Sequence, residues 1–166
     1  MPELILASSS PRRQLLLSAA GVDFSIQAPH VDERRVDGED PDRMVVRLAR
    51  EKALAIEADP DAVVLGADTT VVLDGMILGK PPDEAGAAEM LLSIAGRTHV
   101  VVSGWALVRN RRTLEDGFET TLVSMRAIDP EEAAAYAASG EPLDKAGAYA
   151  LQGAGARFVA SIAGSR

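Results

Sequence analysis

The chain has 166 residues, and its 17 Lys and Arg residues against 25 Asp and Glu residues give a formal net charge of −8. This length suits one domain with a substantial core, and the apolar content of 47% excludes a disordered chain. Cysteine is absent and there are two histidines, which excludes thiolate and histidine-rich metal sites and leaves carboxylate ligands for Mg²⁺ or Mn²⁺. The acidic balance argues against nucleic-acid binding.

The chain begins with an expected strand, a tight turn and a helix. Residues 4–7 form a short apolar run, and the helix that follows has Ser10 at its N-cap, Pro11 at its first position and Gly21 as a left-handed stop. A second helix is expected over residues 41–59, because its apolar residues keep helical spacing.

After the second helix the pattern changes to strands. Two buried strands, 62–66 and 70–73, flank the segment Ala67-Asp68-Thr69, and Asp74-Gly75 is a strong hairpin turn. The remaining elements are a helix at 83–95, strands at 98–108 and 118–128 joined by a polar turn, a helix capped by Asp129, a Gly/Ala-rich segment at 144–156 and a strand at 158–162. The hairpins exclude a purely parallel sheet, so the pattern predicts a mixed α/β domain without repeats.

No export or membrane signal is apparent in the sequence. The N-terminal apolar run lacks a basic lead and is too short for a signal peptide, and the other apolar stretches have the length of strands. We therefore expect a cytoplasmic protein without a membrane partner.

The segment Ser8-Ser9-Ser10-Pro11-Arg12-Arg13 joins the first strand to the first helix. Helix N-termini favour anions, hydroxyl groups can donate to a phosphate, and two arginines can bind it bidentately. The pattern is compatible with a phosphate site, but by itself it slightly favours a capped helix that carries two solvated arginines.

Lysine is rare in this chain, since 14 of the 17 basic residues are arginine. The three lysines are Lys52 inside the second helix, Lys80 between a glycine and a proline, and Lys145 in the Gly/Ala-rich segment. Each can supply a compact ammonium to a fixed anion, or can be an ordinary surface residue.

Two acidic positions are candidates for chemistry. Asp68 follows a buried strand, where a carboxylate is costly unless it serves a metal, a proton transfer or an Asx-turn. The pair Asp32-Glu33 lies in a loop, where solvent exposure is the simpler interpretation. In the Gly/Ala-rich segment, Gln152 can read the amide and carbonyl groups of a base, although a flexible surface loop has the same composition. Since no Ser-His-Asp set, Walker loop or dinucleotide fingerprint is found, hydrolysis of a phosphate anhydride by carboxylate, lysine, arginine and magnesium remains.

Five motifs in order resemble the Maf family of nucleoside triphosphate pyrophosphatases. They are residues 8–13, Arg50-Glu51-Lys52-Ala53, Gly66-Ala67-Asp68-Thr69, Gly79-Lys80-Pro81 and the segment from Asp144 to Gly153. The resemblance implies a single Maf-like domain over residues 1–166, with an elongated mixed sheet flanked by helices and two lobes around a central cleft (Maf/ITPase-like). It also implies hydrolysis of a nucleoside triphosphate to the monophosphate and pyrophosphate, with Mg²⁺ or Mn²⁺.

The resemblance further implies a role for each matching residue. Arg12, Thr69 and Gln152 stand where the dTTP/UTP subgroup has them, whereas the 7-methyl-GTP subgroup has Trp, Gln and Glu. Asp68 would be the general base and would share a metal with Glu33. The cations and hydroxyls expected on the triphosphate are Lys52, Lys80, Arg12, Arg13 and Ser8, and the base would be read by Thr69 and Gln152.

Family members usually continue beyond residues 162–165, so the C-terminal end is expected to be truncated. A homodimer is also compatible with the family. Two other functions remain open at this point: a nucleotide-binding regulator of septum formation without significant turnover, and an enzyme of the same fold that acts on damaged purine nucleotides.

Overall fold

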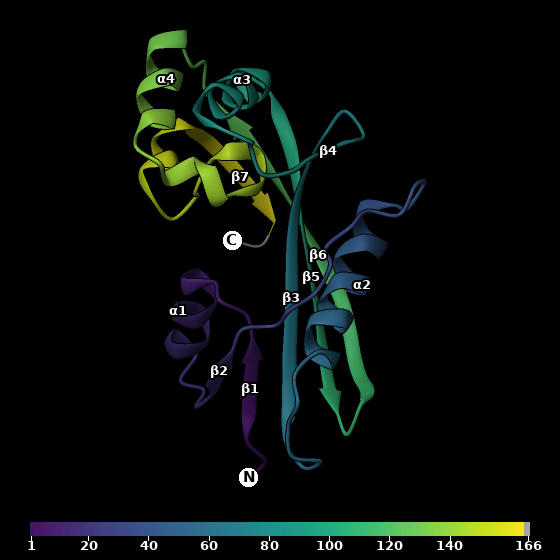
Figure 1. The fold of residues 1–166 in the computed structure, drawn as a ribbon. Helices are drawn as coiled ribbons and strands as arrows, with labels where there is room; N and C mark the ends of the chain where they lie inside the picture. Colours follow the sequence, from purple (N-terminus) through teal and green to yellow (C-terminus); the bar gives the residue numbers. More distant parts are fainter. Residues whose placement is uncertain (165–166) are drawn as a thin grey trace. The chain divides into compact units, whose positions relative to one another are not determined.

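The computed structural model describes residues 1–164, and the last two residues, where the expected truncation falls, lie outside the described part. The strands are β1 Leu4–Ala7, β2 Ser25–Gln27, β3 Val63–Leu73, β4 Met76–Leu78, β5 Thr98–Arg109, β6 Arg112–Met125 and β7 Val159–Gly164. The helices are α1 Pro11–Ala19, α2 Pro41–Leu54, α3 Glu84–Ile94 and α4 Pro130–Ala138, with 3₁₀ turns η1 Glu141–Asp144, η2 Ala146–Ala148 and η3 Ala154–Phe158. Figure 1 labels the helices and strands.

The described strands form one mixed sheet. Its order is β2-β1-β3-β5-β6-β7, and β4 pairs with β3 outside this path. β1 runs parallel to both β2 and β3, whereas β4 is antiparallel to β3 and β7 is antiparallel to β6. The mixed α/β prediction is therefore confirmed.

The chain divides into two compact units. The first comprises residues 1–68 and 103–119, and the second comprises residues 69–102 and the chain from Thr120. In the first unit, residues of β1, of the end of α2 and of the start of β3 pack together in one core. They include Ile5, Ala53, Ile56 and Val64. In the second unit α3 packs on α4 (Figure 1). The buried apolar residues of these two helices form a core with Phe158 and the end of β6.

Local signals in the sequence placed several boundaries correctly. At the start of α4 the Asp129 side chain accepts from the Glu132 amide, and the Glu132 carboxylate accepts from the Asp129 amide, which is the reciprocal capping arrangement. Asp74 and Gly75 both have positive φ, at 50° and 76°, as the two-residue hairpin between β3 and β4 requires. Ser10 does stand at the N-cap of α1, but its side chain makes no capping hydrogen bond.

Three predicted boundaries are wrong. α2 ends at Leu54 rather than near residue 59, because Ile56 turns into the core of the first unit and takes the chain out of the helix. The two predicted strands around Asp68 are a single strand, β3, and β6 begins at Arg112 rather than near residue 118. In each case contacts with distant parts of the chain, and not local propensity alone, decide where the element begins or ends.

Within residues 1–164 no helix has both the length and the apolar character that a bilayer crossing would require. The cytoplasmic location and the homodimer stay predictions.

Candidate active site

The first unit brings α2 unusually close to the sheet. A Cβ added at Gly66 on β3 would lie 1.9 Å from the carbonyl oxygen of Ala49, and one at Gly104 on the neighbouring β5 would lie 2.4 Å from the backbone of Val45. These two positions therefore require glycine, because any side chain would push the helix away. Lys52 follows Ala49 by three residues, and Asp68 follows Gly66 by two, so the helical and strand periods place both on the facing surfaces.

Lys52 lies between two carboxylates. Its Nζ donates to Asp68 Oδ1 at 2.7 Å, and it is 2.6 Å from Glu33 Oε1. Lys52 and Asp68 are both buried, whereas about half of the Glu33 side chain, 47%, is exposed. Asp68 is thus a mid-strand residue with a fixed ammonium partner, and the prediction that it follows the end of a strand is wrong.

Arg47 on α2 orders the loop that carries Glu33. Its guanidinium binds both oxygens of Glu39, at 2.7 and 2.8 Å, and donates to the Arg34 carbonyl at 3.1 Å. A third contact reaches Glu51 at 3.1 Å. These contacts tie the loop to α2 next to Lys52. Asp32 and Glu33 are both exposed, as expected, and Glu33 also pairs with Lys52.

The start of α1 contributes polar groups to the same unit. Ser8 is buried, and its Oγ accepts from the Ser10 amide at 3.1 Å and from Arg13 Nη1 at 3.2 Å. Arg13 lies close enough to Asp68, Glu33 and Arg12 for their charges to shift its pKa. Ser8, Arg12, Arg13, Glu33, Lys52 and Asp68 are therefore all placed within one unit.

Burial shifts the pKa values of two members of this cluster, Asp68 and Arg13. Burial raises the pKa of Asp68 above its usual value, and the Lys52 ammonium and the Arg13 charge oppose that rise. Burial also lowers the pKa of Arg13, against the attraction of Asp68. A carboxylate whose pKa is raised by burial and opposed by a specific cationic partner is a candidate for proton transfer.

The other predicted residues belong to the second unit. Lys80 is exposed, and its charge contributes to lowering the pKa of Asp144, although the main cause is the hydrogen bond from Lys145 at 2.7 Å. The Gly147 amide donates to the Gly79 carbonyl at 3.3 Å, so the lysine motif at 79–81 packs against the segment 144–153. Gln152 is exposed in that segment, and Thr69 is partly buried on β3.

The segment 144–153 is well packed rather than a flexible surface loop. Residues 147–150 are buried, and Gly147 has a φ of +75° with its Cβ position only 2.9 Å from Val71. His99 Nε2 and the Tyr149 hydroxyl share a hydrogen bond of 2.7 Å in the core of the second unit. The surface-loop interpretation of this segment is therefore wrong.

Oxygen donors suitable for a hard divalent cation are present at the Lys52 cluster. Glu33 and Asp68 already hold one cation, the ammonium, with an oxygen from each carboxylate. Mg²⁺ commonly takes one or two protein carboxylates and completes its shell with water and substrate phosphates. The described residues include no group of three or more His, Asp and Glu that could hold a metal alone, so a metal here would depend on such additional ligands.

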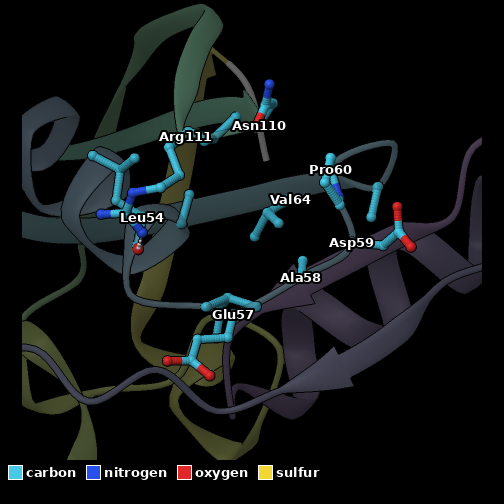
Figure 2. A pocket seen from close by; sticks show the side chains of 12 residues that line it. Leu54, Glu57, Ala58, Asp59, Pro60, Val64, Asn110 and Arg111 are labelled. Atoms are coloured by element: carbon cyan, nitrogen blue, oxygen red, sulfur yellow. Dashed lines mark hydrogen bonds between the residues drawn. The ribbon is translucent and has the colours of Figure 1, made fainter.

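A separate pocket of about 310 Å³ opens elsewhere in the first unit, at the end of α2 (Figure 2). Its walls come from Leu54 to Ala62 and from the β5–β6 turn, where Arg111 donates to the Leu54 carbonyl at 3.4 Å. None of the predicted site residues lines it. The Lys52 cluster, with its buried Lys52–Asp68 pair, is therefore the candidate site, and it lies apart from this pocket.

Sequence reasoning missed the residues that support the cluster. Isolated glycines within strands, here Gly66 and Gly104, indicate close backbone approach and could have shown where α2 packs on the sheet. Arg47 gave no such indication, because a helix arginine has the same local pattern whether it is solvated or bound to a distant loop.

The fold and the cluster define an α/β protein with a charged, oxygen-rich site. The family model of Maf-like proteins matches residues 3–166. The dTTP/UTP pyrophosphatase of Symbiobacterium thermophilum is 49% identical over 165 residues, which are 99% of this chain and 84% of that protein. Proteins of the same name from Salmonella typhimurium and Moorella thermoacetica are 50% and 48% identical over 99% of this chain, and over 84% and 86% of their own lengths. The chain belongs to the Maf family, as its motifs indicated.

Proposed function

We propose that this protein is a nucleoside triphosphate pyrophosphatase that hydrolyses dTTP and UTP to the monophosphate and pyrophosphate. The observation that carries the proposal is the buried Lys52–Asp68 pair with Glu33 beside it. Relatives that match nearly the whole chain are dTTP/UTP pyrophosphatases, which supports both the reaction and the substrate class.

Asp68 acts as the general base in this proposal. It takes a proton from a water molecule, whose oxygen attacks the α-phosphorus while the bond to the bridging β-phosphate oxygen breaks. The monophosphate and pyrophosphate are then the two products. The burial that raises the Asp68 pKa makes the carboxylate a stronger base, and Lys52 keeps it ionised before the proton is taken.

Cations neutralise the triphosphate and the departing pyrophosphate. Positioning and charge neutralisation are the main tasks of a protein in phosphoryl transfer. Arg13 and the Ser8 hydroxyl at the start of α1, together with Arg12, supply donors in the first unit. Lys80, in the motif Gly79-Lys80-Pro81, is proposed to serve the same purpose.

A divalent metal, Mg²⁺ or Mn²⁺, completes the proposed site. Glu33 and Asp68 would hold it, because their oxygens already converge on a cation and match the preference of these ions for carboxylates. When bound, the metal would withdraw charge from the phosphate oxygens.

Base selection is assigned to Arg12, Thr69 and Gln152. In a triple variant these residues are replaced by Trp, Gln and Glu, the set of the 7-methyl-GTP subgroup. The ratio of kcat/KM for 7-methyl-GTP to kcat/KM for UTP should then rise. An unchanged ratio would place specificity elsewhere.

A product assay tests the function directly. The protein is incubated with dTTP, UTP, CTP, GTP or 7-methyl-GTP and with Mg²⁺ or Mn²⁺, and monophosphate, diphosphate, pyrophosphate and orthophosphate are separated. Monophosphate and pyrophosphate from dTTP and UTP are expected. Asp68→Asn should lower kcat by at least about 10³-fold while dTTP still binds, and Asp61→Asn, an exposed aspartate in the same unit, is the control. Bound dTTP that the wild-type protein leaves intact would instead indicate a nucleotide-binding regulator.

A further inference from the structure

A tyrosine and a glutamate enclose the turn that carries Gln152. Tyr136 on α4 is buried, and its hydroxyl donates to Glu141 Oε2 and accepts from the Ala150 amide at 3.0 Å. Beyond the turn, the Ala154 amide donates to Glu141 Oε1 at 3.0 Å and the Gly155 amide donates to Glu141 Oε2 at 3.2 Å. We call this pair, Tyr136 and Glu141, the clasp.

Gln152 lies inside the segment that the clasp holds at both ends. The Gly153 amide donates to the Ala150 carbonyl at 3.1 Å, which closes a four-residue turn with Gln152 at its third position. Ala150 is bound on one side of Gln152, and residues 154 and 155 are bound on the other. The exposed Gln152 side chain therefore projects from a backbone whose conformation the clasp determines.

Two glycines show how closely the clasp approaches this backbone. A Cβ at Gly153 would lie 2.1 Å from Glu141 Oε1, and one at Gly155 would lie 2.7 Å from the Tyr136 hydroxyl. The carboxylate thus occupies space that a side chain on the turn would fill. The same bonds, together with the Lys145 charge, lower the pKa of Glu141 against the opposing effect of burial, so Glu141 remains an anion that accepts from three donors.

We infer that Tyr136 and Glu141 are positioning residues that set the choice of nucleobase by holding the Gln152 turn. This inference rests on the proposed function, in which Gln152 reads the base. The position from which the Gln152 amide reaches the base is set by its backbone, and a displacement of about 1 Å is enough to weaken hydrogen bonds that distinguish uracil from cytosine. The clasp touches no substrate, and acts through the backbone on either side of Gln152.

A double-mutant cycle separates positioning from general stability. The measured quantity is the ratio of kcat/KM for UTP to that for CTP in Tyr136→Phe, Glu141→Gln, Gln152→Ala and the pairwise combinations. Each clasp change should lower this ratio about tenfold, as expected for the loss of a hydrogen bond to a charged group. In the Gln152→Ala background the same clasp change should leave the ratio within about twofold of its value in Gln152→Ala alone, because the side chain that the clasp positions is absent.

Glu131→Gln is the matched control, because Glu131 is an exposed glutamate on the same helix as Tyr136. It should leave the UTP-to-CTP ratio unchanged. The inference is overturned if clasp variants lower kcat/KM equally for both nucleotides, or if they lower the ratio equally with and without Gln152. If Tyr136→Phe does not fold, Glu141→Gln alone completes the cycle.

Amide hydrogen exchange keeps a failure of the clasp distinct from a failure of the proposed function. The amides of Ala150, Ala154 and Gly155 should exchange at least about tenfold faster in the clasp variants than in the wild-type protein. Unchanged exchange would overturn the inference even if the enzyme hydrolyses UTP. If the clasp variants exchange faster but the wild-type protein hydrolyses no nucleotide, the clasp does hold the turn and the proposed function is rejected. The role of the clasp in base choice is then rejected as well.

Discussion

The Cβ position at Gly66 lies 1.9 Å from the carbonyl oxygen of Ala49, so β3 and α2 meet backbone to backbone. This contact brings Lys52 within 2.7 Å of Asp68, because each is a short step along its element from the contact point. The charged cluster thus depends on a residue that carries no charge and no side chain.

Gly66→Ala should therefore weaken both the fold and the site. The added methyl group must displace α2, which we expect to cost about 3 kcal/mol and to lower Tm by roughly 10 °C. Thermal unfolding measures the first effect and pyrophosphate release the second. Gly117→Ala is the control, since the three atoms nearest to its added Cβ belong to the Trp105 side chain, at 3.0–3.4 Å, and not to a helix backbone. A wild-type Tm in Gly66→Ala would contradict the close approach.

Lys52→Met should raise the pKa of Asp68 further. Burial already raises the native pKa above 3.8, and Lys52 is the strongest opposing influence. Because the native state then holds the proton more tightly than the unfolded chain does, the free energy of unfolding falls as pH rises from 3.8 through the native pKa. This window should extend to higher pH in Lys52→Met.

Carbon-13 NMR titration of the Asp68 carboxyl group measures the Lys52→Met effect without relying on activity. Lys145→Met is the control, because Lys145 pairs with Asp144 and is not among the charges that shift the Asp68 pKa. An Asp68 titration that stays the same in Lys52→Met would mean that the ammonium does not control the base.

Arg47→Met should loosen the loop that carries Glu33. The variant loses the paired contact with Glu39 and the bond to the Arg34 carbonyl. We expect the Mn²⁺ concentration for half-maximal activity to rise about tenfold, as when an outer support of a metal ligand is removed. The exposed Arg43 on the same helix provides the control variant, Arg43→Met. Equal metal dependence in Arg47→Met and Arg43→Met would show that Arg47 does not order Glu33.

His99 should make the protein sensitive to acid. Burial lowers the pKa of His99 to about 4, so between pH 6.5 and that value the unfolded chain binds the extra proton and the native state does not. The free energy of unfolding should therefore fall as the pH falls through this window.

His99→Gln tests the acid sensitivity, because glutamine can still bond to Tyr149 but does not titrate. Urea unfolding at pH 7 and pH 4.5 should show that the variant loses about 2 kcal/mol less than the wild-type protein between the two. The exposed His30, changed in the same way, is the control. An equal loss in wild type and His99→Gln would mean that the folded protein binds a proton at His99 as readily as the unfolded chain does, so that burial does not lower the His99 pKa.

Element types were predictable where the information is local. The capping pair Asp129 and Glu132 and the turn at Asp74-Gly75 each satisfy backbone requirements within a few residues, so the sequence is sufficient to place them. The end of α2 was not predictable in this way, since the residues after Leu54 suit a helix and only the burial of Ile56 ends it. β3 was divided wrongly because glycine and aspartate are weak strand formers unless a helix and an ammonium face them.

For the site, too, some features follow from the sequence and others depend on tertiary packing. The sequence alone identified the carboxylates, lysines and arginines and, through their motifs, the family, because these depend on residue identity and order. Only the tertiary structure decided that Glu33, Lys52 and Asp68 meet, that Arg47 holds the loop before α2, and that Tyr136 and Glu141 enclose the Gln152 turn. Those relationships join residues from different strands, helices and loops, and the distance between such residues is set by backbone packing rather than by sequence separation.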